Sequence, residues 1–336
     1  MTPAKLFLFA SFVRGVMPVG VAPWNAAEIA GCQIQFVDAA QGWMLCGYPG
    51  TLQSTHDGGK TWRREELPGT VAQSEGVPIR GRLQSPSRGW IAFNGTLFTK
   101  NDRGASWSSP LAIPLGTTRS QTLSIDVSPD QRMVAALAES ADQPNDVALV
   151  TSDMGQSWKK HPFERGKFRK VAIGLDSTVF LIGAEGIMRS ADGGDTWNGA
   201  QLINPVRSKS SYRMGRPMSS FFLGALGWLV YEDGYVLRTG DRGQTWEQVA
   251  RPTQVWPANT WPGSFTIRFL TTEHGYQIGG DGLLRESHDS GFTWKVVPLD
   301  PEKVADISCY GLRTCYAVTN RARLLQIDAI SPMVAR

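Results

Sequence analysis

Six aspartates in this 336-residue chain share one setting, two residues before a glycine and five before a tryptophan. A carboxylate in a glycine-containing loop is the kind of group that binds calcium, which prefers oxygen ligands. Calcium takes roughly six to eight oxygens, usually from several carboxylates, whereas Asp102-Arg103-Gly104 offers one acid beside a basic residue. We therefore expect no calcium site. The six pairs are Asp57 and Trp62, Asp102 and Trp107, Asp153 and Trp158, Asp192 and Trp197, Asp241 and Trp246, and Asp289 and Trp294.

The histidines and cysteines do not indicate a zinc site. The histidines are scattered, two of them occupy the variable second position of the repeated motif, and no two cysteines are separated by two residues. Zinc sites are commonly marked by such closely spaced ligands. We therefore expect no metal and no cofactor. The four histidines are His56, His161, His274 and His288.

Turn chemistry explains the repeated motif, whose full form is Ser/Thr-x-Asp-x-Gly-x-Ser/Thr-Trp. Only the second copy, which begins at Lys100, breaks the first position. The aspartate can accept hydrogen bonds from backbone amides a few residues on, the glycine supplies a left-handed φ, and the hydroxyl caps free backbone groups. The tryptophan begins the next strand and covers the hairpin. We therefore expect the six motifs to be structural.

The spacing of the motif predicts the fold. The aspartates recur at steps of 45, 51, 39, 49 and 48 residues, the length of one four-stranded propeller blade. An alternating apolar segment and a Gly-aromatic segment precede several copies, as in Gly42-Trp43, Gly227-Trp228 and Gly275-Tyr276. The same strands recur without a motif over 307–309, 315–318 and 324–327. The chain is therefore predicted to be all-β, a seven-bladed β-propeller of four-stranded antiparallel blades, six with the motif and one degenerate.

The motif resembles the Asp-box, or BNR repeat, of sialidases, sortilin-type receptors and photosystem II assembly-factor propellers. The longer pattern, with Phe36, Trp43, Gly50-Thr51-Leu52 and the first Asp-box, is most similar to the photosystem II assembly and stability factor group and its non-photosynthetic bacterial relatives. The resemblance covers roughly residues 31 to 330. It implies a propeller that binds a protein partner or a membrane-protein complex without catalysis.

A sialidase-like protein that binds or hydrolyses glycans is the alternative function. Sialidases use an arginine triad, a tyrosine activated by a glutamate, and an aspartate. The Arg-Ile-Pro segment of sialidases has only a reversed counterpart here, Pro78-Ile79-Arg80. Tyr212, which lies beside Arg213, is the one loop tyrosine whose neighbours suit a catalytic role. These departures favour the non-catalytic function.

Basic residues gather in the segments that connect one predicted blade to the next. Such connections share one face of a propeller, opposite the Asp-boxes, so their charges can act together on an acidic partner. Acids in other turns of that face, such as Glu185 and Glu232, offer partial neutralisation. We expect a partner-binding basic face made of Arg80, Arg82, Arg119, Arg165, Lys167, Arg169, Lys170, Arg207, Lys209, Arg213 and Arg216.

The four cysteines bear on the compartment. Cys309 and Cys315 flank one predicted hairpin turn, and Cys32 and Cys46 lie at the ends of another strand pair. Pairing within each hairpin is the preferred choice among three connectivities, and it favours an oxidising compartment. Four free thiols in a cytoplasmic protein remain the alternative.

The first thirty residues allow several interpretations. Lys5 precedes an apolar run, residues 6–13, that resembles a signal-peptide core. Ile29-Ala30-Gly31-Cys32 resembles a lipidation site. Residues 19–29 offer instead an outer strand that closes the seventh blade, and cleavage at Cys32 would remove that closure. We expect an N-terminal segment over residues 1–30 and a single propeller domain over 31–336.

Charge and hydropathy exclude some classes of protein. A formal net charge of +4 without a Lys/Arg tract does not indicate nucleic-acid binding. No stretch of 18 uncharged apolar residues occurs, so no transmembrane helix is expected. We expect an exported protein, periplasmic or extracellular and in some cases membrane-associated, with a cytoplasmic location as the alternative.

Overall fold

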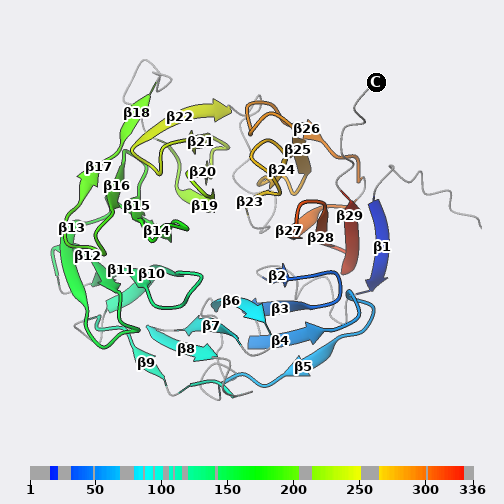
Figure 1. Cartoon of the computed structure of the whole chain (residues 1–336), viewed down its shortest axis with the longest axis horizontal. Coiled ribbons are helices and arrows are strands. Elements are labelled where there is room, and N and C mark those ends of the chain that lie inside the picture. Colours follow the sequence, from blue (N-terminus) through cyan, green and yellow to red (C-terminus); the bar gives the residue numbers. More distant parts are fainter. Residues whose placement is uncertain are drawn as a thin grey trace, which may run out of the picture.

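The described part of the chain consists of strands joined by turns and loops. The computed structural model describes residues 16–21, 32–47, 50–68, 79–85, 88–93, 95–100, 106–108, 110–115, 120–140, 143–203, 214–250, 265–299 and 302–328. Seven sheets built from these residues stand in a ring around a central axis (Figure 1). The predicted seven-bladed β-propeller is confirmed.

In blades 1 to 6 the chain runs from the axis outward through four antiparallel strands, here called A to D in that order. Blade 1 contains β2 (Gln33–Phe36), β3 (Gly42–Gly47), β4 (Gly50–Thr55) and β5 (Arg63–Glu65). Blade 2 contains β6 (Arg80–Ser85), β7 (Arg88–Phe93), β8 (Thr96–Lys100) and β9 (Leu111–Ala112). Blade 3 contains β10 (Ser120–Val127), β11 (Val134–Ser140), β12 (Asn145–Thr151) and β13 (Lys159–Glu164).

Blades 4 to 6 repeat this order, and blade 5 gains a fifth strand, β18 (Gln201–Ile203), which pairs in parallel with its outer strand. Blade 4 contains β14 (Lys170–Ile173), β15 (Val179–Ile182), β16 (Ile187–Ser190) and β17 (Asn198–Gly199). Blade 5 contains β19 (Pro217–Leu223), β20 (Leu226–Tyr231), β21 (Val236–Thr239) and β22 (Thr245–Ala250). Blade 6 contains β23 (Thr266–Phe269), β24 (Gly275–Ile278), β25 (Leu284–Ser287) and β26 (Lys295–Val296).

Blade 7 is assembled from both ends of the ring. Its inner three strands are β27 (Val304–Tyr310), β28 (Thr314–Thr319) and β29 (Arg323–Asp328), and its outer strand is β1 (Val16–Val21). β1 pairs antiparallel with β29, with Val16 opposite Ile327 and Val21 opposite Arg323. The closing strand thus begins three residues earlier than residues 19–29, the range expected from the sequence. Most of that expected range lies outside the described residues.

The Gly-aromatic segments organise the packing between blades. In blade 5 Gly227 faces Phe222 across the A–B pair, where an added β-carbon would lie 2.7 Å from the ring. The glycine therefore leaves room for the phenylalanine, and the next residue, Trp228, stacks on Phe269 of blade 6 with ring centroids 3.7 Å apart. Each such buried aromatic contributes about 2–3 kcal/mol through burial. Equivalent stacks join Phe180 to Phe222 and Phe36 to Tyr316.

In the Asp-boxes that the structure describes, the glycine two residues after the aspartate also lies against the preceding blade. Gly59 has φ +89°, and a β-carbon there would lie 2.1 Å from Leu324 Cδ2 in blade 7. Gly243 has φ +77° and would place one 2.2 Å from Phe180 Cε1 in blade 4. The motif therefore sets the distance between blades as well as the turn, a role that sequence analysis did not predict.

Both cysteine pairs form disulfides between strands A and B of one blade. Cys32 bonds Cys46 in blade 1, and Cys309 bonds Cys315 in blade 7, where the two residues lie opposite each other on β27 and β28. No cysteine is free. The two covalent links thus stand on neighbouring blades, one on each side of the point where the ring closes.

Candidate binding site in the central channel

The inner strands surround a central channel with a cavity of about 380 Å³. Four basic side chains line it: Arg80 and Arg82 from β6, Lys170 from β14 and Arg268 from β23. The two β6 arginines are exposed to the channel, and the other two side chains are half-buried. Among the described residues, none of the four has a carboxylate within 4 Å. Arg268 donates a hydrogen bond to the carbonyl of Ile267 at 2.8 Å. Among the described residues, the channel therefore presents four cations that lack a carboxylate at ion-pair distance.

Two acids face the same channel, and the backbone of a neighbouring blade engages both. Asp126 on β10 accepts a hydrogen bond from the backbone N–H of Ile173 at 2.9 Å. Asp306 on β27 accepts one from Ile34 N at 2.9 Å and one from Thr266 Oγ1 at 2.9 Å. Burial raises the pKa of both carboxyl groups, against the opposing effect of the hydrogen bonds and nearby cations.

These acids belong to a set of polar side chains that joins one inner strand to the next. An inner strand is a free sheet edge with unpaired backbone N–H groups. Side chains of the preceding blade bind some of these N–H groups. In each case a side chain on strand A of one blade accepts a hydrogen bond from a backbone N–H on strand A of the next blade. The further members are Gln33 with Gly81, Gln35 with Leu83, Ser124 with Val171, and Ser308 with Phe36.

The cations influence one another across the ring. Burial lowers the pKa of Lys170 to about 8, and repulsion from Arg80 and Arg268 adds to the effect while Asp126 opposes it. Partial loss of solvent inside the ring likewise lowers the pKa of Arg80 and Arg268, but a guanidinium stays protonated near neutral pH. Four cations and two acids leave a formal excess of two positive charges. The low-dielectric walls make that excess act strongly on any anion that enters.

The arrangement suits carboxylate or phosphate groups. Guanidinium groups form paired hydrogen bonds to such planar or multi-oxygen anions, and an ammonium adds a point charge. The acids offset part of this charge, but their oxygens accept backbone N–H groups and form no ion pair with the cations among the described residues. The channel is therefore the candidate anion-binding site of the described residues.

The structure relocates part of the predicted basic face. Arg80, Arg82 and Lys170 were expected in the connections between blades, but they lie on the inner strands β6 and β14. Arg268 was not predicted. The sequence pattern that could have identified it is Ile267-Arg268-Phe269, in which a charged residue stands between two buried apolar residues of a strand. The alternation of apolar residues had already predicted that strand.

The predicted cations outside the channel have other contacts. Arg169 forms an ion pair with Glu139 at 3.2 Å, and Arg216 forms one with Glu232 at 2.6 Å. Arg165 donates a hydrogen bond to the carbonyl of Gln143, and the Lys167 ammonium lies 5.9 Å from the centroid of the Phe168 ring. Arg119, Arg207, Lys209 and Arg213 lie outside the described residues, as does Tyr212.

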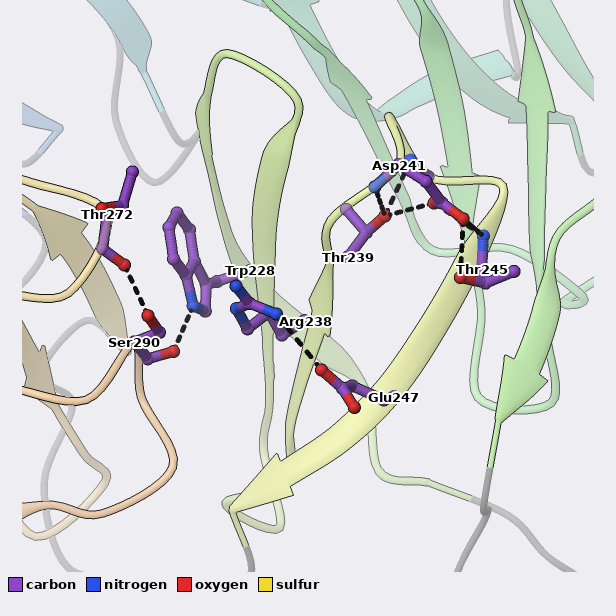
Figure 2. A network of polar contacts seen from close by, with 9 residues as sticks. Trp228, Arg238, Thr239, Asp241, Thr245, Glu247, Thr272 and Ser290 are labelled. Atoms are coloured by element: carbon purple, nitrogen blue, oxygen red, sulfur yellow. Dashed lines mark hydrogen bonds and ion pairs between the residues drawn. The ribbon is translucent and has the colours of Figure 1, made fainter.

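The described Asp-boxes, on the opposite face, close through hydrogen bonds of their own. In blade 5 (Figure 2), Thr239 Oγ1 donates to Asp241 Oδ1 at 2.8 Å and accepts from Gly243 N at 2.9 Å. The Asp241 carboxylate also accepts from Thr245 N at 2.9 Å and from Thr245 Oγ1 at 2.7 Å. The same bonds recur in blades 1, 3, 4 and 6. Asp102 lies outside the described residues.

The bonds to the ionised carboxylate have an electrostatic consequence. The Thr61 hydroxyl and backbone N–H lower the pKa of Asp57 to about 2. Hydrogen bonds from Ser157 and from Thr196 lower the pKa of Asp153 and of Asp192 in the same way. Most carboxylate oxygens of the motif are thus engaged within the turn, which leaves few for a ligand.

Comparison with known proteins gives relatives along most of the chain. No family model matches. The photosystem II assembly protein Ycf48 of Thermosynechococcus vestitus is 25% identical over 315 residues, which covers 78% of this chain and 84% of that protein. The chain is similar to the photosystem II assembly factors. The stability/assembly factor HCF136 of Arabidopsis thaliana is 25% identical over 121 residues, and the match spans 28% of that protein's length.

Solved structures agree on the fold. A structure of YCF48 bound to D1 peptide matches with a TM-score of 0.62 and 17% identity, covering 94% of this chain and 96% of that one. Streptogramin B lyase matches with a TM-score of 0.65 and 11% identity, covering 94% and 97%. Both likenesses show the propeller alone. Because one neighbour is an assembly-factor relative and the other an enzyme, the fold does not decide between binding and catalysis.

The described residues contain no helix of the length and apolar character needed to cross a membrane.

Proposed function

We propose that the protein is a non-catalytic scaffold of the assembly-factor type, which binds an acidic segment of a protein partner at the central channel. The observation that carries the proposal is the charge arrangement there. Four cations, including Arg80 and Lys170, lack carboxylate partners within 4 Å among the described residues, while Asp126 and Asp306 are engaged by backbone amides. The channel thus attracts anions, whereas the ion-paired Arg169 and Arg216 leave less charge for a partner.

The relatives support a protein partner from a membrane complex. Ycf48 is named as a photosystem II assembly protein, and one of the solved relatives is described as bound to D1 peptide. A scaffold of this kind would use electrostatic attraction to speed encounter and to select acidic segments. The sialidase-like alternative is not favoured, since the relatives that match most of the chain are assembly proteins.

We also propose that the protein works outside the cytoplasm, at a periplasmic or extracellular site that includes membrane surfaces. Disulfides persist mainly in oxidising compartments, and all four cysteines are paired. Fractionation of cells that produce the chain from its own promoter tests this. Recovery of the folded protein with the periplasmic or medium fraction supports export, and recovery with the cytosol contradicts it.

The binding proposal is tested with a fluorescent peptide rich in Glu and Asp and a matched peptide in which Gln and Asn replace the acids. We expect the protein to bind the acidic peptide and not its neutral counterpart. Arg82→Gln combined with Lys170→Gln should weaken binding about tenfold or more, which corresponds to about 1.4 kcal/mol. Fluorescence polarisation at low and at physiological salt provides the readout, with weaker binding expected at higher salt.

The control variant is Arg242→Gln, which removes a cation from the Asp-box face. Its side chain pairs with Asp176 at 3.7 Å and lies away from the channel cations. It should bind the acidic peptide as the wild type does. Equal loss in the channel and control variants, or equal binding of the two peptides, would show that the channel is not the site.

A further inference from the structure

Two of the histidines that look scattered in the sequence, His274 and His288, meet Glu286 on the Asp-box face of blade 6. His274 Nε2 lies 2.7 Å from Glu286 Oε1, and His288 Nε2 lies 3.5 Å from Glu286 Oε2. The two imidazole rings are stacked with centroids 4.4 Å apart. One ligand atom from each residue lies within 4.8 Å of the others. We propose that these three side chains form a binding site for a divalent transition-metal ion of the zinc class.

The donor set suits such an ion. Imidazole nitrogens and a carboxylate are common ligands of Zn²⁺ and its neighbours, bound at about 2.0–2.2 Å. Two ligand atoms on one tetrahedral ion are then separated by about 3.3 Å. The three ligand atoms all lie within 4.8 Å of one another, so their separations exceed this value by at most about 1.5 Å. Rotation of His288, whose side chain is 52% exposed, supplies an adjustment of that size.

The loops that carry the two histidines are fixed to each other. His274 ends the A–B turn of blade 6, and His288 is the second residue of its Asp-box. Ser290 of the Asp-box donates its N–H to the carbonyl of Glu273 at 2.9 Å and its hydroxyl to that of Thr272 at 2.7 Å. The Ser290 carbonyl accepts from the Trp228 indole of blade 5 at 2.8 Å (Figure 2). The ligands therefore stand on a rigid base.

A neighbouring phenol holds the carboxylate in place. Tyr276 is buried, and its hydroxyl donates to Glu286 Oε1 at 2.8 Å. Carboxylate ligands of metals are normally oriented by such hydrogen bonds. Tyr276 is thus a positioning residue, and three protein ligands leave at least one coordination position to water or to a partner's side chain.

Blade 1 provides a natural comparison. It carries His56 at the position of His288, but Gln41 and Ser54 stand where blade 6 has His274 and Glu286. The Asp-box turn is the same in both blades, so a site that needed only an Asp-box histidine would occur in each. The proposal predicts a site in blade 6 alone.

The test is metal binding by the tag-free full chain after treatment with a chelator. We expect one Zn²⁺ per chain by calorimetry and elemental analysis, and Co²⁺ should give visible absorption bands from a nitrogen- and oxygen-ligated ion. His274→Ala, His288→Ala and Glu286→Gln should each weaken Zn²⁺ binding tenfold or more. Tyr276→Phe, which keeps the ring, should weaken it about tenfold.

His56→Ala is the matched control and should bind Zn²⁺ with unchanged affinity and stoichiometry. Circular dichroism and thermal unfolding of the metal-free variants verify the fold. Because Glu286→Gln preserves the shape of the side chain, it decides the matter if an alanine variant fails to fold. The proposal is overturned if the wild type binds no Zn²⁺, or if the His274 and His288 variants bind it as well as the wild type.

Discussion

Asp57 and Gly59 lie two residues apart and have different roles. Asp57 accepts the hydrogen bonds that close the turn, with Thr61 as the main donor. Gly59 combines a positive φ with a close approach to Leu324 of the preceding blade. The first role can be derived from residue types, because it is local. The second depends on a side chain more than 260 positions away, which no local pattern reveals.

The pKa of Asp57 predicts a pH dependence of stability. The folded-state pKa of about 2 lies below the ordinary value of 3.8. The stabilisation is therefore fully present above about pH 4 and is lost as the pH falls through about 2. Asp57→Asn imitates the protonated state in charge, so its melting temperature should be lower than that of the wild type at pH 6. The difference should shrink toward pH 2, and a difference that stays constant with pH would contradict the assignment.

Gly243 offers a test of the contact between blades. Gly243→Ala places a methyl group against Phe180 of blade 4 at a positive φ. Overpacking and backbone strain together should lower the free energy of unfolding by about 2–4 kcal/mol. Gly224 has φ +62° and no atom within 4 Å of an added β-carbon. Gly224→Ala should therefore cost only about 1 kcal/mol, and equal losses in chemical denaturation would refute the contact.

The sequence predicts most strands of the propeller, but it does not predict which distant segments pair to close the ring. The Asp-box spacing and the Gly-aromatic segments predict seven blades because both depend on neighbours within one repeat. Strand β1 was expected at residues 19–29 and lies at Val16–Val21. Its partner β29 is more than 300 residues away, so its register is set by a strand that local periodicity does not include. Arg80 and Lys170 were assigned to connections because each stands at the first residue of its strand.

The pairing of β1 with β29 makes ring closure testable by truncation. Removal of residues 1–22 takes away a strand and exposes the edge of β29. We expect a loss of several kcal/mol and a fall in melting temperature of roughly 5 °C or more, together with self-association through the free edge. Removal of residues 1–14 keeps β1 and should change little. Calorimetry and size-exclusion chromatography measure both effects, and identical behaviour of the two truncations would contradict the role of β1.

The charge of the channel belongs to the molecule as a whole. Arg82, Lys170 and Arg268 come from three blades, and only the closed ring brings them near one another. Arg82 and Lys170 were predicted to share a basic face made of the connections between blades, but their place in the channel was not predicted, because no spacing along the chain encodes distance across the axis.

We expect Lys170 to make the proposed binding at the channel depend on pH. Its pKa of about 8 means that the ammonium is lost as the pH rises through that value. Affinity for the acidic peptide should therefore fall between about pH 7 and pH 9, with a midpoint raised somewhat in the complex because a bound anion favours the charged form. Lys170→Arg keeps the charge over this range and should remove the pH dependence. An unchanged pH profile in that variant would exclude Lys170 from the site.

Blade 7, which takes β1 from one end of the chain and β27 to β29 from the other, imposes an order on biosynthesis. While the ribosome makes the polypeptide, β1 emerges first and has no partner until residue 328 has been added. An unpaired strand on a nascent polypeptide is prone to associate with other chains. The ring can therefore close only after translation of blade 7 is complete. Until that point, a chaperone or a translocation machine can bind the unpaired β1 segment.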